Sequence, residues 1–215
     1  MSIAAIKKRL YESGIVSILR GGFSPDDMVA AAEALLAGGI TVVEVTMNSE
    51  HVVDGIAALR DQLGDKVLIG AGTVRTAQDV ERAVDAGAAF LVAPCLDLPS
   101  VETARRHDIL LLPGIFTASE AQAAFVAGCE TVKLFPADAL GPSYLKALRA
   151  PLDHIDFLPT GGITPGTLPD FHAAGAVAFG AGSYLVKNEA VTSESLEKLT
   201  ARARLLQTAL EQARA

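Results

Sequence analysis

Eight short apolar runs, each followed by a stretch with helical periodicity, constrain the fold of this chain more than any other feature. The runs have the length and the Val, Ile, Leu and Ala content of buried strands. They cover residues 15–19, 40–45, 67–69, 89–92, 109–112, 131–135, 155–158 and 176–179. Strands that alternate with helices pair in parallel, because each helix carries the chain back to the start of the next strand. The pattern therefore predicts an α/β protein.

The stretches between these runs carry the signals that begin and end helices. We predict helices over residues 25–37, 77–86, 118–127, 142–150 and 193–214, and a short amphipathic helix over residues 1–12, before the first strand. Side-chain oxygens suited to capping precede four helix starts, at Ser24, Thr76, Thr117 and Thr164. A glycine suited to a left-handed cap follows alanine at four helix ends, at Gly38, Gly87, Gly128 and Gly175.

Eight strand-helix units can close into a barrel or lie as an open, doubly wound sheet. The first strand is not followed by the GxGxxG pattern of a dinucleotide fold, which favours the barrel. No Pro/Ser-rich linker or low-complexity tract divides the 215 residues. We therefore expect one domain over residues 1–215, a (β/α)8 TIM barrel with an additional N-terminal helix.

Charge and composition exclude several classes of function. The net charge is -7 and Lys and Arg form no stripe, which argues against nucleic acid as a partner. No apolar run is long enough for a signal peptide or a membrane span. Cys95 and Cys129 form no CxxC pair, and the four histidines lack metal-ligand spacing. We expect a cytoplasmic protein that needs no metal or other cofactor.

Two predicted strands carry a charged residue in mid-run. Glu44 stands between two valines, and Lys133 stands between Val132 and Leu134. If Val132 and Leu134 face the helices, alternation along the strand points Lys133 into the barrel. An unpaired buried charge costs several kcal/mol, against a domain stability of roughly 5–15 kcal/mol, so both residues need a partner or a function.

These two charges have two interpretations. One is a structural ion pair between Glu44 and Lys133, although an apolar pair would usually stabilise the fold as well or better. The other is a lysine nucleophile whose pKa is lowered by burial, with a carboxylate near enough to move protons.

Glycine-rich segments follow the last two predicted strands. They are Thr160-Gly161-Gly162 and Gly180-Ala181-Gly182-Ser183. The loops after strands seven and eight of a TIM barrel frequently bind phosphate through backbone N–H groups. Glycine is also common in ordinary turns, but two such loops in the expected positions favour a phosphorylated substrate.

Six motifs in register now resemble the family of 2-keto-3-deoxy-6-phosphogluconate (KDPG) aldolases. They are Glu44-Val-Thr46, Gly70-Ala-Gly-Thr73, Pro113-Gly114, Lys133-Leu-Phe135-Pro136, Thr160-Gly-Gly162 and Gly182-Ser183. The resemblance runs through nearly the whole chain. It implies a class I aldolase that cleaves KDPG to pyruvate and glyceraldehyde 3-phosphate, and that commonly also acts on 4-hydroxy-2-oxoglutarate.

The resemblance also implies roles for individual residues. Lys133 matches the Schiff-base lysine and Glu44 the general acid/base. Thr73 matches a ligand of the pyruvate carboxylate, and Thr160 matches a contact to the sugar hydroxyls. Pro94 and Phe135 match the walls of the pyruvyl pocket, and the matching phosphate ligands are Gly161, Gly162, Gly182 and Ser183.

One position departs from the pattern. Some members carry an arginine where this chain has Asn48, whereas relatives with an arginine at the end of the first strand use that one, which corresponds to Arg20. We therefore expect Arg20 and Thr73 to hold the carboxylate, with Arg20 offering a bidentate fork.

Several alternatives stay open at this stage. Segments around Arg20 and Asn48 resemble the 2-keto-3-deoxy-6-phosphogalactonate (KDPGal) branch, which differs at C4, whereas Thr160 follows the KDPG pattern. A phosphosugar isomerase, epimerase or decarboxylase could share the barrel and its phosphate loops without a lysine imine. A catalytically silent binding module would leave both mid-strand charges unexplained. The resemblance further implies a homo-oligomer, commonly a trimer.

Overall fold

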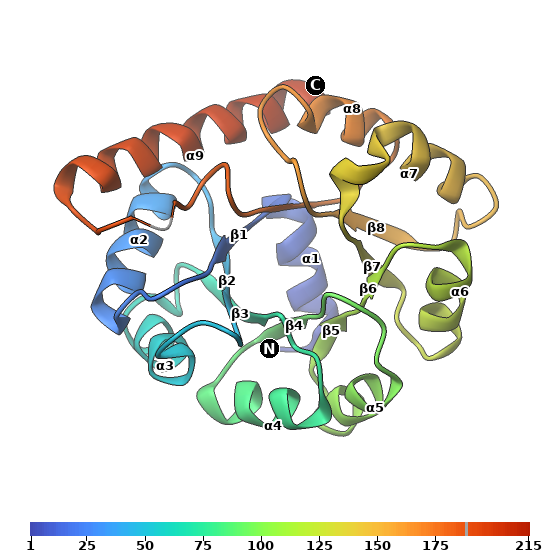
Figure 1. The fold of residues 1–215 in the computed structure, drawn as a ribbon, viewed down its shortest axis with the longest axis horizontal. Helices are drawn as coiled ribbons and strands as arrows, with labels where there is room; N and C mark the ends of the chain where they lie inside the picture. The colour runs from blue at the N-terminus through green and yellow to red at the C-terminus, as the bar shows by residue number, and fades with distance from the viewer. Residues whose placement is uncertain (188) are drawn as a thin grey trace.

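The chain forms a ring of parallel strands surrounded by helices, in a computed structural model that describes residues 1–187 and 189–215 (Figure 1). The strands are β1 (Ile15–Leu19), β2 (Val42–Thr46), β3 (Leu68–Gly72), β4 (Phe90–Val92), β5 (Leu110–Leu112), β6 (Gly114–Ile115), β7 (Thr131–Leu134), β8 (Asp156–Pro159) and β9 (Phe179–Ala181). The helices are α1 (Ile3–Ser13), α2 (Pro25–Ala37), α3 (Val52–Leu63), α4 (Ala77–Ala86), α5 (Leu98–Arg106), α6 (Ala118–Val126), the 3-10 helix η1 (Ala137–Ala139), α7 (Gly141–Arg149), α8 (Leu168–Ala173) and α9 (Ser193–Arg214).

The strands pair in two parallel sheets whose edges meet. One sheet has the order β5-β4-β3-β2-β1-β9 and the other β6-β7-β8. Pro113, which has no backbone N–H, separates β5 from β6, and its carbonyl accepts from Lys133 N at 2.9 Å. At the other junction Thr160 bridges Gly180 in parallel. Since β5 and β6 are one interrupted strand, the predicted eight-stranded TIM barrel with its N-terminal helix is confirmed.

Two strands extend further into glycine-rich sequence than predicted. The prediction ended one strand at residue 69 and assigned Gly180 to a loop, whereas Gly70 and Gly72 lie in β3 and Gly180 lies in β9. A Cβ on Gly70 would overlap the ring of Phe90, and a Cβ on Gly180 would overlap Thr160 Oγ1. These glycines sit where a neighbouring side chain needs the space, so here glycine continues the strand.

Helix ends follow the predicted capping residues with two corrections. Ser24, Thr76 and Thr117 each accept from a backbone N–H three residues on. Thr164 also accepts from the backbone N–H three residues on, but residues 165–167 form a turn, and α8 begins only at Leu168. Gly38 has a φ of -89°, since the chain turns left-handed only at the next glycine. Within the described residues, no helix is both long and apolar enough to cross a membrane.

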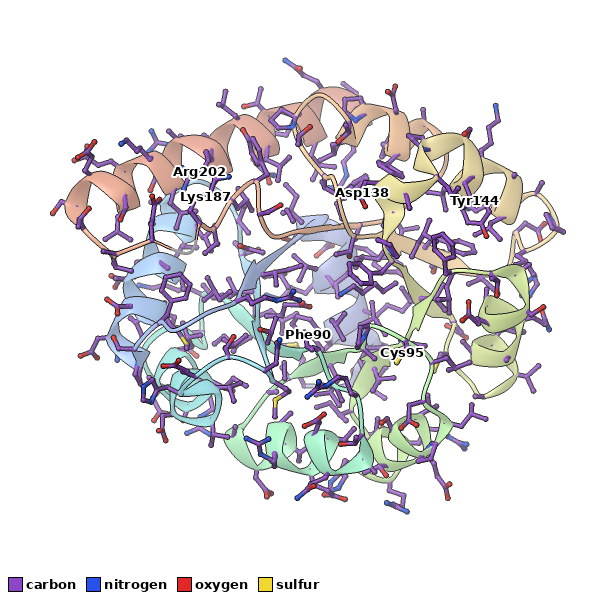
Figure 2. The ribbon with its side chains drawn as sticks, in the orientation of Figure 1. Phe90, Cys95, Asp138, Tyr144, Lys187 and Arg202 are labelled. Carbon is purple, nitrogen blue, oxygen red and sulfur yellow. The ribbon has the colours of Figure 1, made fainter. Side chains whose placement is uncertain are left out.

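The core has an outer layer between strands and helices and an inner layer inside the ring. Ile6 and Leu10 of α1 belong to the inner layer, together with Leu68 and Phe90. Figure 1 shows α1 within the outline of the ring, and Figure 2 labels Phe90 at its centre. The hydroxyl of Tyr11 bonds to Asp156 Oδ2 at 2.6 Å, at the start of β8. Helix α1 therefore closes the N-terminal end of the barrel, and the C-terminal end is left for a site.

Candidate active site

Lys133 and Glu44 point into the barrel. Val132 and Leu134, which flank Lys133 on β7, pack in the outer layer against the helices. Alternation along the strand therefore turns Lys133 inward, where the residue is 3% exposed. Glu44 on β2 is 2% exposed. The inward direction expected for Lys133 is what the fold produces.

The two charges do not form a direct ion pair among the described residues. Glu44 Oε1 is buried and has no hydrogen-bond partner there. A Cβ on Gly72 would overlap this oxygen, so the absence of a side chain at Gly72 makes room for the carboxylate. A static ion pair is thus not what holds Glu44 in place, and the carboxylate keeps an unused acceptor inside the barrel.

The pKa shifts of Lys133 and Glu44 both favour the uncharged form of the side chain. Burial is the main cause that lowers the pKa of the Lys133 ammonium, and the cation of Arg20 lowers it further while Glu44 raises it. Burial likewise raises the pKa of the Glu44 carboxyl, against the opposing effects of Lys133 and Arg20. A lysine that is more easily deprotonated is a better nucleophile, and a carboxyl with a raised pKa is a better proton donor.

A cavity of about 400 Å³ opens above Lys133. Its lining contains eight of the predicted site residues, namely Arg20, Lys133, Phe135, Thr160, Gly161, Gly162, Gly182 and Ser183. The ammonium of Lys133 lies 5.1 Å from the centroid of the Phe135 ring. The lining also includes Ile18, Ile163, Val186 and Lys187, which are not among the predicted site residues. For Lys187 a signal existed, since a cation four residues after Ser183 is within reach of the same loop.

Three predicted site residues are not part of this lining: Glu44, Thr73 and Pro94. Arg20 Nη2 donates to Thr73 Oγ1 at 3.4 Å, so these two expected carboxylate ligands do lie together. Thr73 has a φ of +56°, which is rare for a β-branched residue and is typical of functional sites. Pro94 is half-buried near the start of the loop after β4, where its carbonyl packs against Gly114.

The two predicted phosphate loops lie on the same cavity. Gly161 and Gly162 have φ values of +108° and +68°, and a Cβ on either would collide with Asp138, which Figure 2 labels. The Thr160 carbonyl accepts from Ala137 N at 2.9 Å. Thr160 Oγ1 is buried and has no hydrogen-bond partner among the described residues. Ala137 and Asp138 therefore pack against this loop on one side, and the loop lines the cavity on the other.

Groups that could hold a metal ion were not found in the described part of the chain. No cluster of three or more His, Cys, Asp or Glu side chains with suitable geometry occurs within residues 1–187 and 189–215. The side chains that line the cavity offer the amines of Lys133 and Lys187, the guanidinium of Arg20 and the hydroxyls of Thr160 and Ser183.

A buried lysine and a buried carboxyl inside a TIM barrel are the groups that a class I aldolase needs, and the comparisons with known proteins show that the chain is of this class. The model of the KDPG and KHG aldolase family matches residues 6–202, and the chain belongs to this family.

Two relatives from Escherichia coli K12 are equally similar to the chain. The KHG/KDPG aldolase is 37% identical over 177 residues, covering 82% of this chain and 83% of that protein. The 2-dehydro-3-deoxy-6-phosphogalactonate aldolase is 37% identical over 174 residues, covering 80% and 84%. Identity alone therefore does not separate the two substrate types.

A solved structure adds the type of chemistry. The KDPG aldolase of Legionella pneumophila, with pyruvate captured as a covalent carbinolamine intermediate, has a TM-score of 0.79 and 28% identity, and the match covers 95% of this chain and 96% of that one. Family membership favours the aldolase over the isomerase, epimerase or decarboxylase that the sequence left open.

Proposed function

We propose that this enzyme cleaves KDPG to pyruvate and glyceraldehyde 3-phosphate, with Lys133 as the Schiff-base residue. The observation that carries the proposal is the placement of Lys133. Its ammonium is buried, has a lowered pKa and lines a cavity to which two glycine-rich loops also contribute. A 2-keto acid with a phosphate at its far end matches both ends of that cavity.

The lysine performs covalent catalysis. The neutral amine of Lys133 attacks C2 of the substrate to form a carbinolamine, which loses water to give a protonated imine. This cation withdraws electrons from the C3–C4 bond, so the bond breaks to leave an enamine on Lys133 and the aldehyde product. Protonation of the enamine at C3 and addition of water release pyruvate and regenerate the amine.

Glu44 is the residue we assign to the proton transfers. It would donate a proton to the carbinolamine hydroxyl as water leaves, accept the proton of the C4 hydroxyl as the C3–C4 bond breaks, and return one to C3. Its raised pKa and its unpartnered Oε1 support this role. A water molecule can relay these protons, because no ion pair joins Glu44 and Lys133 among the described residues.

The pyruvyl half of the substrate needs a cation and an apolar wall. We assign the carboxylate to Arg20 and Thr73, whose side chains lie 3.4 Å apart. Arg20 presents a planar fork that fits a carboxylate, and Phe135 and Pro94 would enclose the three pyruvyl carbons. The phosphate is assigned to Gly161, Gly162, Gly182 and Ser183, through backbone N–H groups and the serine hydroxyl.

Thr160 bears on the choice between KDPG and its C4 epimer. Thr160 lines the cavity, and its buried hydroxyl, which has no partner among the described residues, is the group that we assign to the C4 or C5 hydroxyl of a substrate. The KDPGal aldolase is the alternative function, supported by Arg20 and by the equal identity to a relative of that type. A Thr160→Val substitution is expected to reduce kcat/KM for KDPG more than for KDPGal.

The first experiment tests the imine. Intact mass spectrometry after incubation with pyruvate and sodium borohydride should reveal the mass of reduced pyruvate on the wild type. A Lys133→Met variant should gain no mass, and Lys146→Met, which alters an exposed lysine on α7, should behave as the wild type. Absence of the adduct in the wild type would refute the proposed mechanism.

The second experiment tests the substrate. Initial rates of pyruvate release are measured with KDPG, KDPGal and 4-hydroxy-2-oxoglutarate, each at several concentrations. The proposal predicts the highest kcat/KM for KDPG. A higher value for KDPGal would assign the enzyme to the other branch while leaving the lysine mechanism intact.

Three further expectations accompany this function. We propose that the chain acts as one barrel domain, that it assembles as a homotrimer and that it works in the cytoplasm. Cys95 and Cys129 are both free thiols, which fits a reducing compartment. Light scattering coupled to size-exclusion chromatography would test the trimer, since a mass of about one chain, 22.3 kDa, would contradict it.

A further inference from the structure

Lys187 lies on the wall of the active-site cavity, on the segment that follows β9. The residue is exposed, and its ammonium donates a hydrogen bond to the Ser183 carbonyl at 2.7 Å. The side chain therefore folds back over the loop that contains Gly182 and Ser183. Its charge stands beside the backbone groups that we assign to the phosphate.

The segment that carries Lys187 is anchored to the rest of the protein. The backbone N–H groups of Leu185 and Val186 both donate to the Gly182 carbonyl at 2.9 Å. Leu185 is fully buried, and its carbonyl accepts from Arg202 Nε of α9 at 2.8 Å. Figure 2 labels Lys187 and Arg202 side by side along the inner side of α9, and both contact the same small surface hollow. The lysine thus extends from a turn whose position is fixed.

The phosphate ligands proposed so far carry no positive charge, and Lys187 can supply one. The lining of the cavity contains three cations, Arg20, Lys133 and Lys187. Arg20 and Lys133 are assigned to the carboxylate and to the imine. The remaining phosphate ligands are backbone N–H groups and a hydroxyl, which carry no net charge, whereas a phosphate monoester carries about -1.5 to -2 at pH 7.

Lys187 has the hydrogen-bonding capacity to supply that charge. An ammonium has three donors, and the Ser183 carbonyl uses one of them. No acidic side chain in the described part of the chain forms an ion pair with Lys187. Two N–H donors and a full positive charge are therefore available at the end of the cavity that faces the glycine loops.

We propose that Lys187 binds the substrate phosphate and makes the enzyme selective for phosphorylated 2-keto acids over the same acids without phosphate. This inference rests on the proposed aldolase function and adds a charged residue to its phosphate site. The bond to Ser183 orients the ammonium, and the phosphate takes up the two remaining donors.

The test compares a substrate with and without its phosphate. Steady-state rates are measured for whichever phosphorylated C4 epimer the wild type cleaves faster, and for the unphosphorylated 2-keto-3-deoxy acid of the same configuration. In Lys187→Met, the KM for the phosphorylated substrate should rise about 10-fold, as expected for loss of one charge-assisted hydrogen bond at a solvent-accessible site. The values for the unphosphorylated acid and the yield of the pyruvate adduct should stay at wild-type level.

Two other variants separate a phosphate ligand from a loop support. Lys187→Arg keeps the charge and should restore most of the selectivity. Lys8→Met removes a lysine from α1, at the opposite end of the barrel, and should change neither substrate's kinetics. Inorganic phosphate should inhibit the wild type and Lys8→Met competitively, with an inhibition constant about 10-fold higher in Lys187→Met.

The outcomes distinguish this inference from the function on which it rests. An equal loss of rate on both substrates in Lys187→Met, or an unchanged ratio of their kcat/KM values, would overturn the role of Lys187 while leaving the aldolase intact. A wild type that forms no pyruvate adduct would overturn both.

Discussion

Gly72 on β3 packs directly against the carboxylate of Glu44 on the neighbouring strand β2. A Cβ on Gly72 would overlap Glu44 Oε1, and the next nearest atoms are also those of the glutamate side chain. Both residues belong to buried strands in which the backbone cannot move away easily. The size of residue 72 therefore sets where the proposed acid/base can stand.

We expect Gly72→Ala to lower kcat at least 10-fold, because a displaced carboxylate no longer reaches the reacting atoms, and misplacement by about 1 Å can cost two orders of magnitude. Steady-state kinetics and a thermal melt check this, with Gly166→Ala as control, since a Cβ there meets nothing closer than 3.8 Å. An unchanged kcat in a folded Gly72→Ala protein would argue against Glu44 as the acid/base.

Arg20 should influence both the binding of the 2-keto acid and the titration of the site. Arg20→Ala removes the proposed carboxylate fork, so KM for the keto acid should rise about 10- to 100-fold. Arg20 also lowers the pKa of Lys133 and of Glu44, so both pKa values should rise in the variant. The pH profile of adduct formation with pyruvate and borohydride would then shift to higher pH. An unchanged KM would refute the carboxylate assignment.

The buried charges of Glu44 and Lys133 should lower the free energy of unfolding of the wild type. A variant with both Glu44→Gln and Lys133→Met is expected to be inactive yet at least as stable as the wild type at pH 7, with a gain of up to about 4 kcal/mol, because neither buried charge remains. Urea unfolding of both proteins measures the difference. A double variant that is less stable than the wild type would indicate a structural role for the pair.

The pH dependence of that difference follows from the two pKa shifts. Lys133 has a lowered pKa in the fold, so its cost to the wild type fades as pH rises toward the unfolded value of about 10.4. Glu44 has a raised pKa, so its cost appears only as pH rises above the unfolded value of about 4.3. The advantage of the double variant should be largest near neutral pH and shrink at both extremes.

Tyr11 should stabilise the closed end of the barrel without affecting the chemistry. Its hydroxyl bonds to Asp156 and to Thr131, and burial together with Asp156 raises its pKa, so it stays protonated as a donor. Tyr11→Phe should lower the free energy of unfolding by about 1–3 kcal/mol and leave KM unchanged. Tyr184→Phe is the matched control for unfolding, because no hydrogen bond of that hydroxyl to another described residue is present. Equal stability of the two variants would contradict the prediction.

Much of the fold could be predicted because its signals are local. Each strand is a short apolar run, and each helix start at Ser24, Thr76 and Thr117 depends on a capping oxygen within the same turn. Where the predicted end of a strand was wrong, the deciding contact came from another element. Gly180 continues β9 because it faces Thr160, and Gly70 continues β3 because it faces Phe90, and neither neighbour is near in sequence.

The sequence by itself determined which residues are chemically out of place. A lysine between Val132 and Leu134 and a glutamate between two valines are unusual wherever those strands lie, because a buried charge is costly in any fold. The order of the motifs along the chain also indicated the roles of Lys133 and Glu44, and indicated that the loops after the last two strands bind phosphate.

Only the tertiary structure decided the distances and relative orientations of those side chains. Closure of the ring brings Arg20 to Thr73, which is 53 positions away in the chain. It places Lys133 and Lys187 in the lining of the same cavity. It also leaves Lys133 without a direct ion pair to Glu44 among the described residues. Distances between side chains on different strands depend on strand register and barrel closure, which arise from packing of the whole chain and are not encoded in any single segment.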